Sequence, residues 1–247
     1  AFILDPATST VTEPVVIGTK SCYPAQTPKV ERLADCCFTT GILPREDGLV
    51  DLYSGVGDSD EGRITIDNPF VDVPAGQWYT DAVLWAYESG ITTGADATHF
   101  NPGGTLVRQN MVTFLMRFAK TMGVDTSARA DLSGYTEAGQ ILPYAMDAMQ
   151  WAVKVGLIQG VTPTKLDPRG NSTRAQVATI LYALEGKPEN TANQFGDVAP
   201  TAWYYAPVNW CATNGIVVGT GNGNYEPQRD VTREELVTIL RSYADYL

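Results

Sequence analysis

The chain has 247 residues, with 17 Lys and Arg, 28 Asp and Glu and one His, and its net charge is −11. This acidic balance excludes proteins that coat nucleic acid or adsorb electrostatically to anionic lipid, because both need a basic surface. A single His excludes a multi-histidine metal site, and no apolar run approaches the roughly 18–20 residues that span a bilayer. The 44% hydrophobic content, with 23 Gly and 15 Pro, is typical of a globular, loop-rich protein.

Residues 1–69 form an N-terminal region with no internal repeat, and its role is not predicted. The chain starts at Ala1 without Met, so we expect a processed product or a fragment. Residues 9–17 are rich in β-branched residues and interrupted by Pro14, which indicates an edge strand or an extended arm. An extended arm can add a strand to a neighbouring subunit. Residues 29–41 are expected to form one helix that turns into a loop.

Three of the four cysteines lie in this N-terminal region. Outside the cell, Cys22 can form a disulfide with either Cys36 or Cys37, which leaves one odd thiol. The fourth, Cys211, aligns with Ala86 and Ala152 in the repeats described next, so we predict a small buried core residue.

Residues 70–247 contain three copies of one pattern, at about 70–122, 131–186 and 195–247. In each copy an aromatic residue is followed by Trp seven positions later, then by a Gly, a Pro and an Arg at matching distances. The aligned residues are Trp78, Tyr144 and Trp203; Trp85, Trp151 and Trp210; Gly90, Gly156 and Gly215; Pro102, Pro168 and Pro227; and Arg108, Arg174 and Arg233.

Each copy is predicted to be a helix, a Gly-containing loop and a second helix. The first helix carries an apolar stripe and ends at the aligned Gly, and the second begins near the aligned Arg. Polar residues 123–130 and 187–194 are typical of connectors. Because one helix pair cannot bury its own stripe, the three copies should pack around a shared core. The expected fold class is mainly α.

Several motifs in these copies resemble the S-layer homology family. They are Phe70-Val71-Asp72-Val73 before Trp78, Phe195-Gly196-Asp197-Val198 before Trp203, Gly215-Ile216-Val217-Val218-Gly219, Ser172-Thr173-Arg174-Ala175-Gln176 and Val231-Thr232-Arg233-Glu234-Glu235. The resemblance implies a pseudo-threefold helical domain over residues 70–247. It also implies non-covalent attachment to the bacterial cell wall through a secondary wall polysaccharide, which in this family is often modified with pyruvate ketals.

The helix-start motif has a structural explanation that leaves one residue unexplained. Thr173-x-x-Gln176 and Thr232-x-x-Glu235 are capping boxes, which accounts for every residue but the Arg. A cation in the first turn is disfavoured by the helix dipole by about 0.3–1 kcal/mol. The repeated Arg therefore indicates an anionic partner. That partner is either a ligand carboxylate, which would also meet free helix-end N–H groups, or an internal Asp or Glu.

The aromatic residues fall into two classes. Trp85, Trp151 and Trp210 lie on apolar stripes and are predicted to pack in the core. Trp78, Tyr144 and Trp203 lie at helix starts, where they either stack on a sugar or pack against the helix. The candidate carbohydrate-binding residues are Arg108, Arg174, Arg233, Trp78, Tyr144 and Trp203. No motif predicts a catalytic residue, a cofactor or a metal.

Two copies depart from the pattern. In copy one, Val107 cannot cap the second helix, and Asn110 replaces the acidic residue at the third helical position. Copy two lacks the Phe-x-Asp-Val opening and carries a longer loop. At least one groove between copies is therefore expected to be degenerate. If copy one is a damaged groove, Val107→Thr with Asn110→Glu should raise glycan affinity.

Three classes of function remain in competition. The leading hypothesis is a non-enzymatic, extracellular anchoring module that binds an anionic, in some cases pyruvylated, wall polysaccharide. The alternative is a structural subunit of a self-assembling surface layer or filament, in which the N-terminal arm makes the subunit contacts. An enzyme is the least favoured reading, because its active site would have to lie in residues 1–69 or in an unrecognised cleft.

Overall fold

A computed structural model describes the backbone of residues 4–5, 10–11, 37–44, 50–56 and 60–66, and all atoms of residues 68–189 and 193–247. The chain forms two compact units, Ala1–Val71 and Asp72–Leu247. In the described residues of the first unit, β1 (Leu4–Asp5) pairs antiparallel with β2 (Thr10–Val11).

A second, antiparallel sheet in this unit has the order β3 (Cys37–Pro44), β4 (Val50–Val56) and β5 (Asp60–Ile66). The predicted helix over residues 29–41 is therefore wrong at residues 37–41, where the Phe-Thr-Thr run favours the extended backbone of β3. Its first part, most of the segment 9–17 and the bonding of Cys22, Cys36 and Cys37 lie outside the described residues.

The second unit is helical, as the sequence predicts. Its helices are α1 (Thr80–Glu88), α2 (Arg108–Thr121), α3 (Met146–Lys154), α4 (Arg174–Leu184), α5 (Tyr205–Thr213) and α6 (Arg233–Tyr246), with short 3-10 turns η3 (Ala138–Gln140) and η4 (Pro143–Ala145). The second helix of each copy begins at the aligned Arg, and both predicted capping boxes are formed. Among the described helices, none is long and apolar enough to cross a membrane.

The first helix of each copy ends as predicted. Gly90, Gly156 and Gly215 follow the last helical turns with φ values of 72°, 76° and 71°. A side chain is strained in this left-handed region, so glycine is the residue that ends the helix there without cost.

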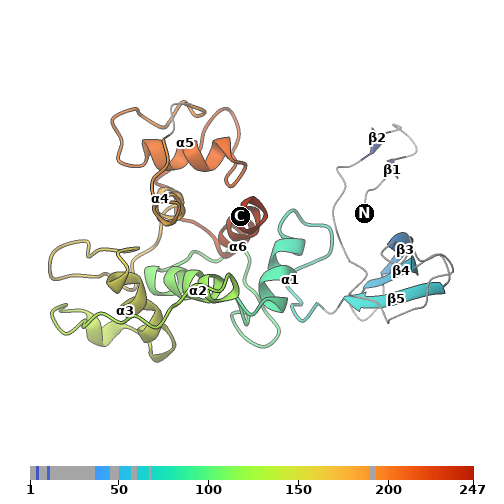
Figure 1. Cartoon of the computed structure of the whole chain (residues 1–247), viewed down its shortest axis with the longest axis horizontal. Helices are drawn as coiled ribbons and strands as arrows, with labels where there is room; N and C mark the ends of the chain where they lie inside the picture. Colours follow the sequence, from blue (N-terminus) through green and yellow to red (C-terminus); the bar gives the residue numbers. More distant parts are fainter. Residues whose placement is uncertain are drawn as a thin grey trace. The chain divides into compact units, whose positions relative to one another are not determined.

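The helices pair between copies. α2 of copy one packs against α3 of copy two, α4 packs against α5 of copy three, and α6 returns to pack against α1. Figure 1 shows α2, α4 and α6 around a common centre, with α1, α3 and α5 outside them. The pairing is cyclic, so among the described helices of the second unit the last, α6, is the partner of the first, α1.

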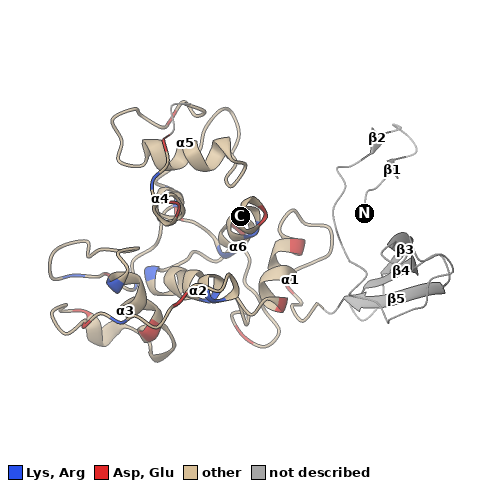
Figure 2. Ribbon diagram, in the orientation of Figure 1, with Lys and Arg blue, Asp and Glu red and all other residues tan. Residues whose placement is uncertain are grey.

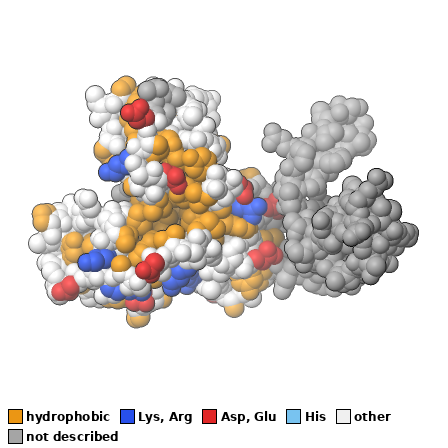
Figure 3. Space-filling model, in the orientation of Figure 1, with side chains coloured by type: hydrophobic (Ala, Val, Ile, Leu, Met, Phe, Trp, Pro, Cys, Tyr) orange, Lys and Arg blue, Asp and Glu red, His pale blue; other side chains and the backbone are white. Residues whose placement is uncertain are grey.

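Backbone hydrogen bonds close the same ring at the centre of the unit. The amide of Leu106 donates to the Val231 carbonyl, Val231 donates to Ser172, and Ser172 donates back to Leu106, at 2.8–3.0 Å. These residues are buried, and Figure 3 shows hydrophobic side chains gathered among α2, α4 and α6. The predicted shared core of three copies is therefore present.

An acidic side chain fixes the loop of each copy. The Asp72 carboxylate accepts hydrogen bonds from the amides of Phe100 and Asn101, and Asp197 does the same for Tyr225 and Glu226. This explains the Asp of the Phe-x-Asp-Val motif. In copy two, where the motif is missing, Glu137 from the inserted loop accepts one such bond, from the amide of Asp167.

The predicted core residues are largely confirmed. Trp151 and Trp210 are buried, as is Cys211, whose thiol lies 3.6 Å from the Ala178 carbonyl oxygen. Trp85 is only partly buried, and it packs against Phe118 with Arg241 over its ring. The prediction for Trp85 is therefore only partly correct.

Candidate functional site

Three related grooves lie where the copies meet. We number each groove by the copy that supplies its Gly-containing loop and its second helix. Groove 1 contains residues 92–95 and α2, groove 2 contains residues 156–159 and α4, and groove 3 contains residues 215–220 and α6. Their volumes are about 440, 340 and 440 Å³, within the usual range of small-ligand sites.

Each groove combines residues from all three copies. Groove 1 is lined by Arg233 and Tyr144, groove 2 by Arg108 and Trp203, and groove 3 by Arg174 and Trp78. The six candidate residues are thus brought together as three pairs, each of one Arg and one aromatic residue. The members of each pair come from different copies, because the helices pair cyclically.

The three aromatic residues remain exposed at the grooves. Their exposed fractions are 62% for Trp78, 56% for Tyr144 and 58% for Trp203. Trp78 and Trp203 also contact the rings of Tyr79 and Tyr204 at centroid distances of 5.3 and 5.1 Å, so each of these rings packs in part against its own helix start and leaves the rest of its surface exposed. Each ring is available to a molecule in its groove.

The arginines are buried, and each reaches across to the next copy. The Nε of Arg108 donates to the Leu166 carbonyl at 3.0 Å. In the same way, the Nε of Arg174 donates to the Tyr225 carbonyl at 2.9 Å, and the Nε of Arg233 donates to the Phe100 carbonyl at 2.6 Å. These carbonyls occupy the same position in each copy. The repeated Arg therefore joins the copies, which is a structural reason for a cation in this unfavourable first-turn position.

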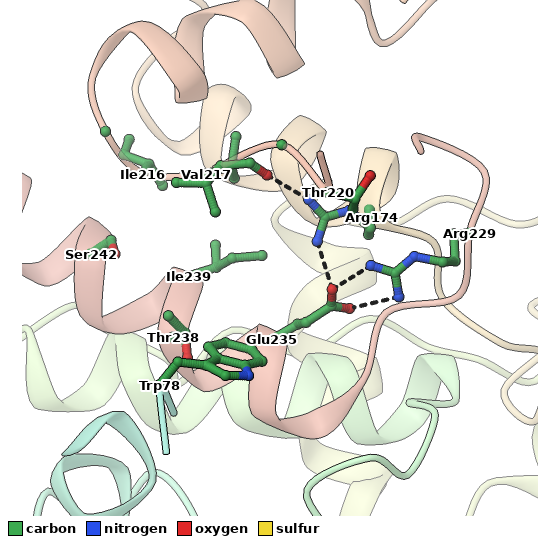
Figure 4. Close-up of a pocket in the computed structure, with 13 residues that line it drawn as sticks. Trp78, Arg174, Ile216, Val217, Thr220, Arg229, Glu235, Thr238, Ile239 and Ser242 are labelled. Atoms are coloured by element: carbon green, nitrogen blue, oxygen red, sulfur yellow. Dashed lines mark hydrogen bonds and ion pairs between the residues drawn. The ribbon is translucent and has the colours of Figure 1, made fainter. Parts of the chain in front are cut away.

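In groove 3 the guanidinium of Arg174 is fully engaged (Figure 4). Its Nη1 donates to Glu235 and its Nη2 to the Val218 carbonyl, both at 2.8 Å. The Glu235 carboxylate also receives hydrogen bonds from Arg229 and from the amide of Thr232. For Arg174, the anionic partner expected from the sequence is thus the internal acid Glu235.

The ion pairs change the acidity of Glu235. Burial alone would raise its pKa, but the hydrogen bonds from Arg229 and Thr232 and the charge of Arg174 outweigh burial and hold the pKa below its ordinary value of 4.5. Arg229 responds in the opposite direction, since its hydrogen bond to Glu235 raises its pKa. Glu235 is therefore a stable carboxylate between two cations.

In groove 2 the guanidinium of Arg108 is partly engaged. Besides the bond of Nε, its Nη2 donates to the Gln159 carbonyl at 2.8 Å. Burial lowers the pKa of Arg108, and the charge of Asp167 opposes that shift. Gln176 stands where groove 3 has Glu235, and its amide oxygen accepts from the Thr173 backbone. None of the described residues that line groove 2 is acidic, and Lys187 adds a second cation to it.

In groove 1 the guanidinium of Arg233 is the least engaged of the three. Among the described residues, the bond from its Nε to the Phe100 carbonyl is its one hydrogen bond. The guanidinium carbon lies 4.7 Å from the Phe100 ring centroid, and Nη2 is buried with no hydrogen-bond partner in the same part of the chain. Burial lowers the pKa of Arg233, and the charge of Asp72 opposes that shift. Asn110 replaces Glu235 here and accepts a 2.5 Å hydrogen bond from the Tyr144 hydroxyl.

One part of the predicted site is wrong. The sequence indicated free N–H groups at the starts of the second helices, but the neighbouring copy already binds them. The amides of Arg174 and Ala175 donate to the carbonyls of Arg229 and Pro227, and equivalent bonds exist at α2 and α6. These helix ends cannot offer a ligand both amides, because close packing of the copies consumes them.

Several groove residues were missed from the sequence. They are Arg117 in groove 1 and Arg229 in groove 3. The other copies have Ala183 and Ser242 at the position of Arg117, and Gly104 and Gly170 at the position of Arg229. The signal was present in the sequence alignment of the copies, as a cation where the other copies have small residues.

Comparison with known proteins decides the family. Residues 69–109, 135–178 and 194–237, together more than half of the chain, match the family described as "S-layer homology domain". This chain belongs to the S-layer homology family. Its residues 1–72 match a second family, described as "Protein of unknown function (DUF1861)".

Curated relatives share the S-layer homology region. An S-layer protein of Bacillus thuringiensis subsp. finitimus is 31% identical over 69% of this chain and 21% of its own length. An amylopullulanase of Thermoanaerobacterium thermosulfurigenes is 29% identical over 51% of this chain and 7% of its own length. The chain therefore spans about a fifth or less of these relatives. Together with the family, they indicate a cell-surface or cell-wall location and an anchoring or S-layer role.

One solved structure is similar to a shorter part of the chain. It is MPT-4, a mannose phosphorylase from Leishmania mexicana in complex with phosphate ion, at 62% identity. The match covers 28% of this chain and 22% of that one, with a TM-score of 0.24, which is too low to support a comparison of folds.

Proposed function

We propose that the helical unit attaches this protein non-covalently to the bacterial cell wall by binding an anionic secondary wall polysaccharide, with no catalysis of its own. The observation that carries this proposal is the grooves' shared composition, a buried guanidinium beside an exposed aromatic ring. A guanidinium recognises a carboxylate, and an aromatic face covers the apolar face of a sugar ring.

The charge of the chain supports selective rather than general anion binding. The net charge is −11, and Figure 2 shows Lys and Arg scattered over the described helices and loops. Such a surface repels polyanions at long range. Binding must therefore come from the grooves, where cations are concentrated and acidic side chains are scarce.

The test is cosedimentation of the purified chain with bacterial sacculi. Sacculi that keep their wall polysaccharide should bind the chain, and sacculi stripped of it should not. The triple variant Trp78→Ala, Tyr144→Ala and Trp203→Ala should lose at least tenfold in affinity with little loss of stability, because these side chains are exposed. The control Tyr87→Ala removes an exposed aromatic on α1 outside the grooves. Equal binding to both kinds of sacculi would contradict the proposal.

A surface-layer subunit is the second candidate, and the relatives named S-layer protein favour it. In this case copies of the chain would assemble with one another, through the N-terminal arm expected from the sequence, a segment that lies largely outside the described residues. Sedimentation of the purified chain without wall material distinguishes the two, because assembly predicts large particles and anchoring does not.

A further inference from the structure

The three grooves differ in one position that decides their charge. The last residue of the capping box is Glu235 in groove 3, Gln176 in groove 2 and Asn110 in groove 1. Among the described residues that line the grooves, Glu235 is the only acidic one. Groove 3 is therefore the one groove that carries its own carboxylate.

Glu235 occupies the place that a bound anion would take. Its carboxylate lies between Arg174 and Arg229, at 2.8 Å from Nη1 of Arg174, and its side chain is 13% exposed. All three nitrogen positions of the Arg174 guanidinium have acceptors. A ligand carboxylate entering groove 3 would have to displace an internal carboxylate that two cations already hold.

Groove 1 has the same framework without that carboxylate. Asn110 is neutral and shorter than Glu, and its oxygen is taken by the Tyr144 hydroxyl. The Nη2 of Arg108 donates to the Gln159 carbonyl, and the Nη2 of Arg174 donates to the Val218 carbonyl. The Nη2 of Arg233 has no such bond and is buried. A buried charged donor without an acceptor is costly, so an acceptor that reaches it is strongly favoured. Arg117 adds a second cation to this wall.

From these differences, and resting on the proposed function, we propose that groove 1 is the principal anion site of this protein and that Glu235 closes groove 3 to anions. The ligand group is a carboxylate on a sugar residue, placed against Arg233 as Glu235 is placed against Arg174, with Tyr144 beside it. Groove 2 is intermediate, since Arg108 keeps two of its internal bonds. Copy one, which lacks both capping-box residues, therefore supplies the groove whose arginine has the fewest internal acceptors.

The test exchanges the charge at this position. The probe is wall polysaccharide on Bacillus thuringiensis sacculi, used intact or with its carboxylates converted to neutral amides, and affinity is measured by cosedimentation. Asn110→Glu should weaken binding to intact sacculi by about tenfold or more, because the new carboxylate pairs with Arg233. Asn110→Gln adds the same length without charge and should cost no more than about threefold. Glu235→Gln should raise the affinity, because it opens groove 3.

The outcomes separate the two proposals. If the unchanged chain does not bind intact sacculi, the proposed function fails. If it binds, but equally well after amidation or with Asn110→Glu, the assignment of groove 1 is overturned while the anchoring function stands. A tenfold loss with Glu235→Gln, in a variant that is still fully folded at the temperature of the binding assay, would place the principal site in groove 3 instead. Melting curves of all variants, recorded by far-UV circular dichroism, show that each one is folded.

Discussion

The role of the buried arginines as links between copies can be tested by comparing Arg174→Met with Arg233→Met. Methionine keeps most of the length and apolar stem of Arg and removes the guanidinium. At position 174 the change deletes three hydrogen bonds, including the pair with Glu235. At position 233 it deletes one hydrogen bond and a contact with the Phe100 ring.

The expected losses follow from these contacts. Breaking a buried ion pair by removing one partner costs about 3–5 kcal/mol, and Glu235 keeps Arg229, so we expect about 3 kcal/mol for Arg174→Met. For Arg233→Met we expect about 1 kcal/mol, because one hydrogen bond is lost while an unpartnered buried nitrogen is removed. For a domain of this size, the larger loss lowers Tm by about 6–12 °C.

The assay is urea and thermal unfolding of the full chain, followed by the helical circular dichroism signal, because all helices in the described residues belong to the second unit. Arg174→Met should lower the midpoint without changing the slope of the urea transition. Equal losses for the two variants would refute the reasoning. So would a loss below about 1 kcal/mol for Arg174→Met, because the guanidinium would then contribute no more than a surface residue.

Four further predictions concern stability and acidity. The pKa of Glu235 is held below 4.5 in the folded chain, so its ion pairs stabilise the fold above that pH and are lost as the pH falls through the folded pKa. Glu235→Gln should therefore reduce the fall of Tm on acidification. An unaltered dependence of Tm on pH in the acid range would contradict this. Trp151→Ala should cost roughly 3–5 kcal/mol by urea unfolding, since this ring is buried, and a loss under 1 kcal/mol would place it outside the core. Val107→Thr should add up to about 1 kcal/mol, because Val107 gives α2 no side-chain cap, and a lower Tm would show that the hydroxyl does not reach the helix end. Burial raises the pKa of Cys211 to about 12, so peptide mapping should find this thiol unalkylated in the native chain at pH 8 and alkylated in urea.

The local features of the fold could be predicted from the sequence, because they depend on residues a few positions apart. Thr173 with Gln176 specifies a helix start, and Gly90 specifies a helix end. The three aligned copies likewise indicate a shared core. The strand that begins at Cys37 was missed, since a short apolar run is compatible with helix or strand until its pairing with β4 is known.

The composition of the grooves could not be predicted in the same way. Asn110 and Arg108 belong to the same copy, and the interpretation of copy one as degenerate assumes that both line the same groove. In the structure Asn110 faces the groove of Arg233, while Arg108 lies in the next groove. This assignment depends on cyclic packing between copies, which no spacing within a copy reveals. It also changes the expectation for glycan affinity. If copy one is a damaged groove, Val107→Thr with Asn110→Glu should raise affinity, whereas the proposal for groove 1 expects Asn110→Glu to lower it.

The closure of α6 onto α1 has a consequence for how the domain is made. A growing chain that has emerged only as far as residue 230 contains two complete copies, yet it lacks the helix that covers α1 and the Arg that reaches Phe100. Grooves 1 and 3 are both unfinished at that stage, because each needs residues beyond 230. We therefore expect attachment through groove 1 only after α6 has been synthesised, so that a chain that ends before α6 is released from the wall instead of occupying a place on it.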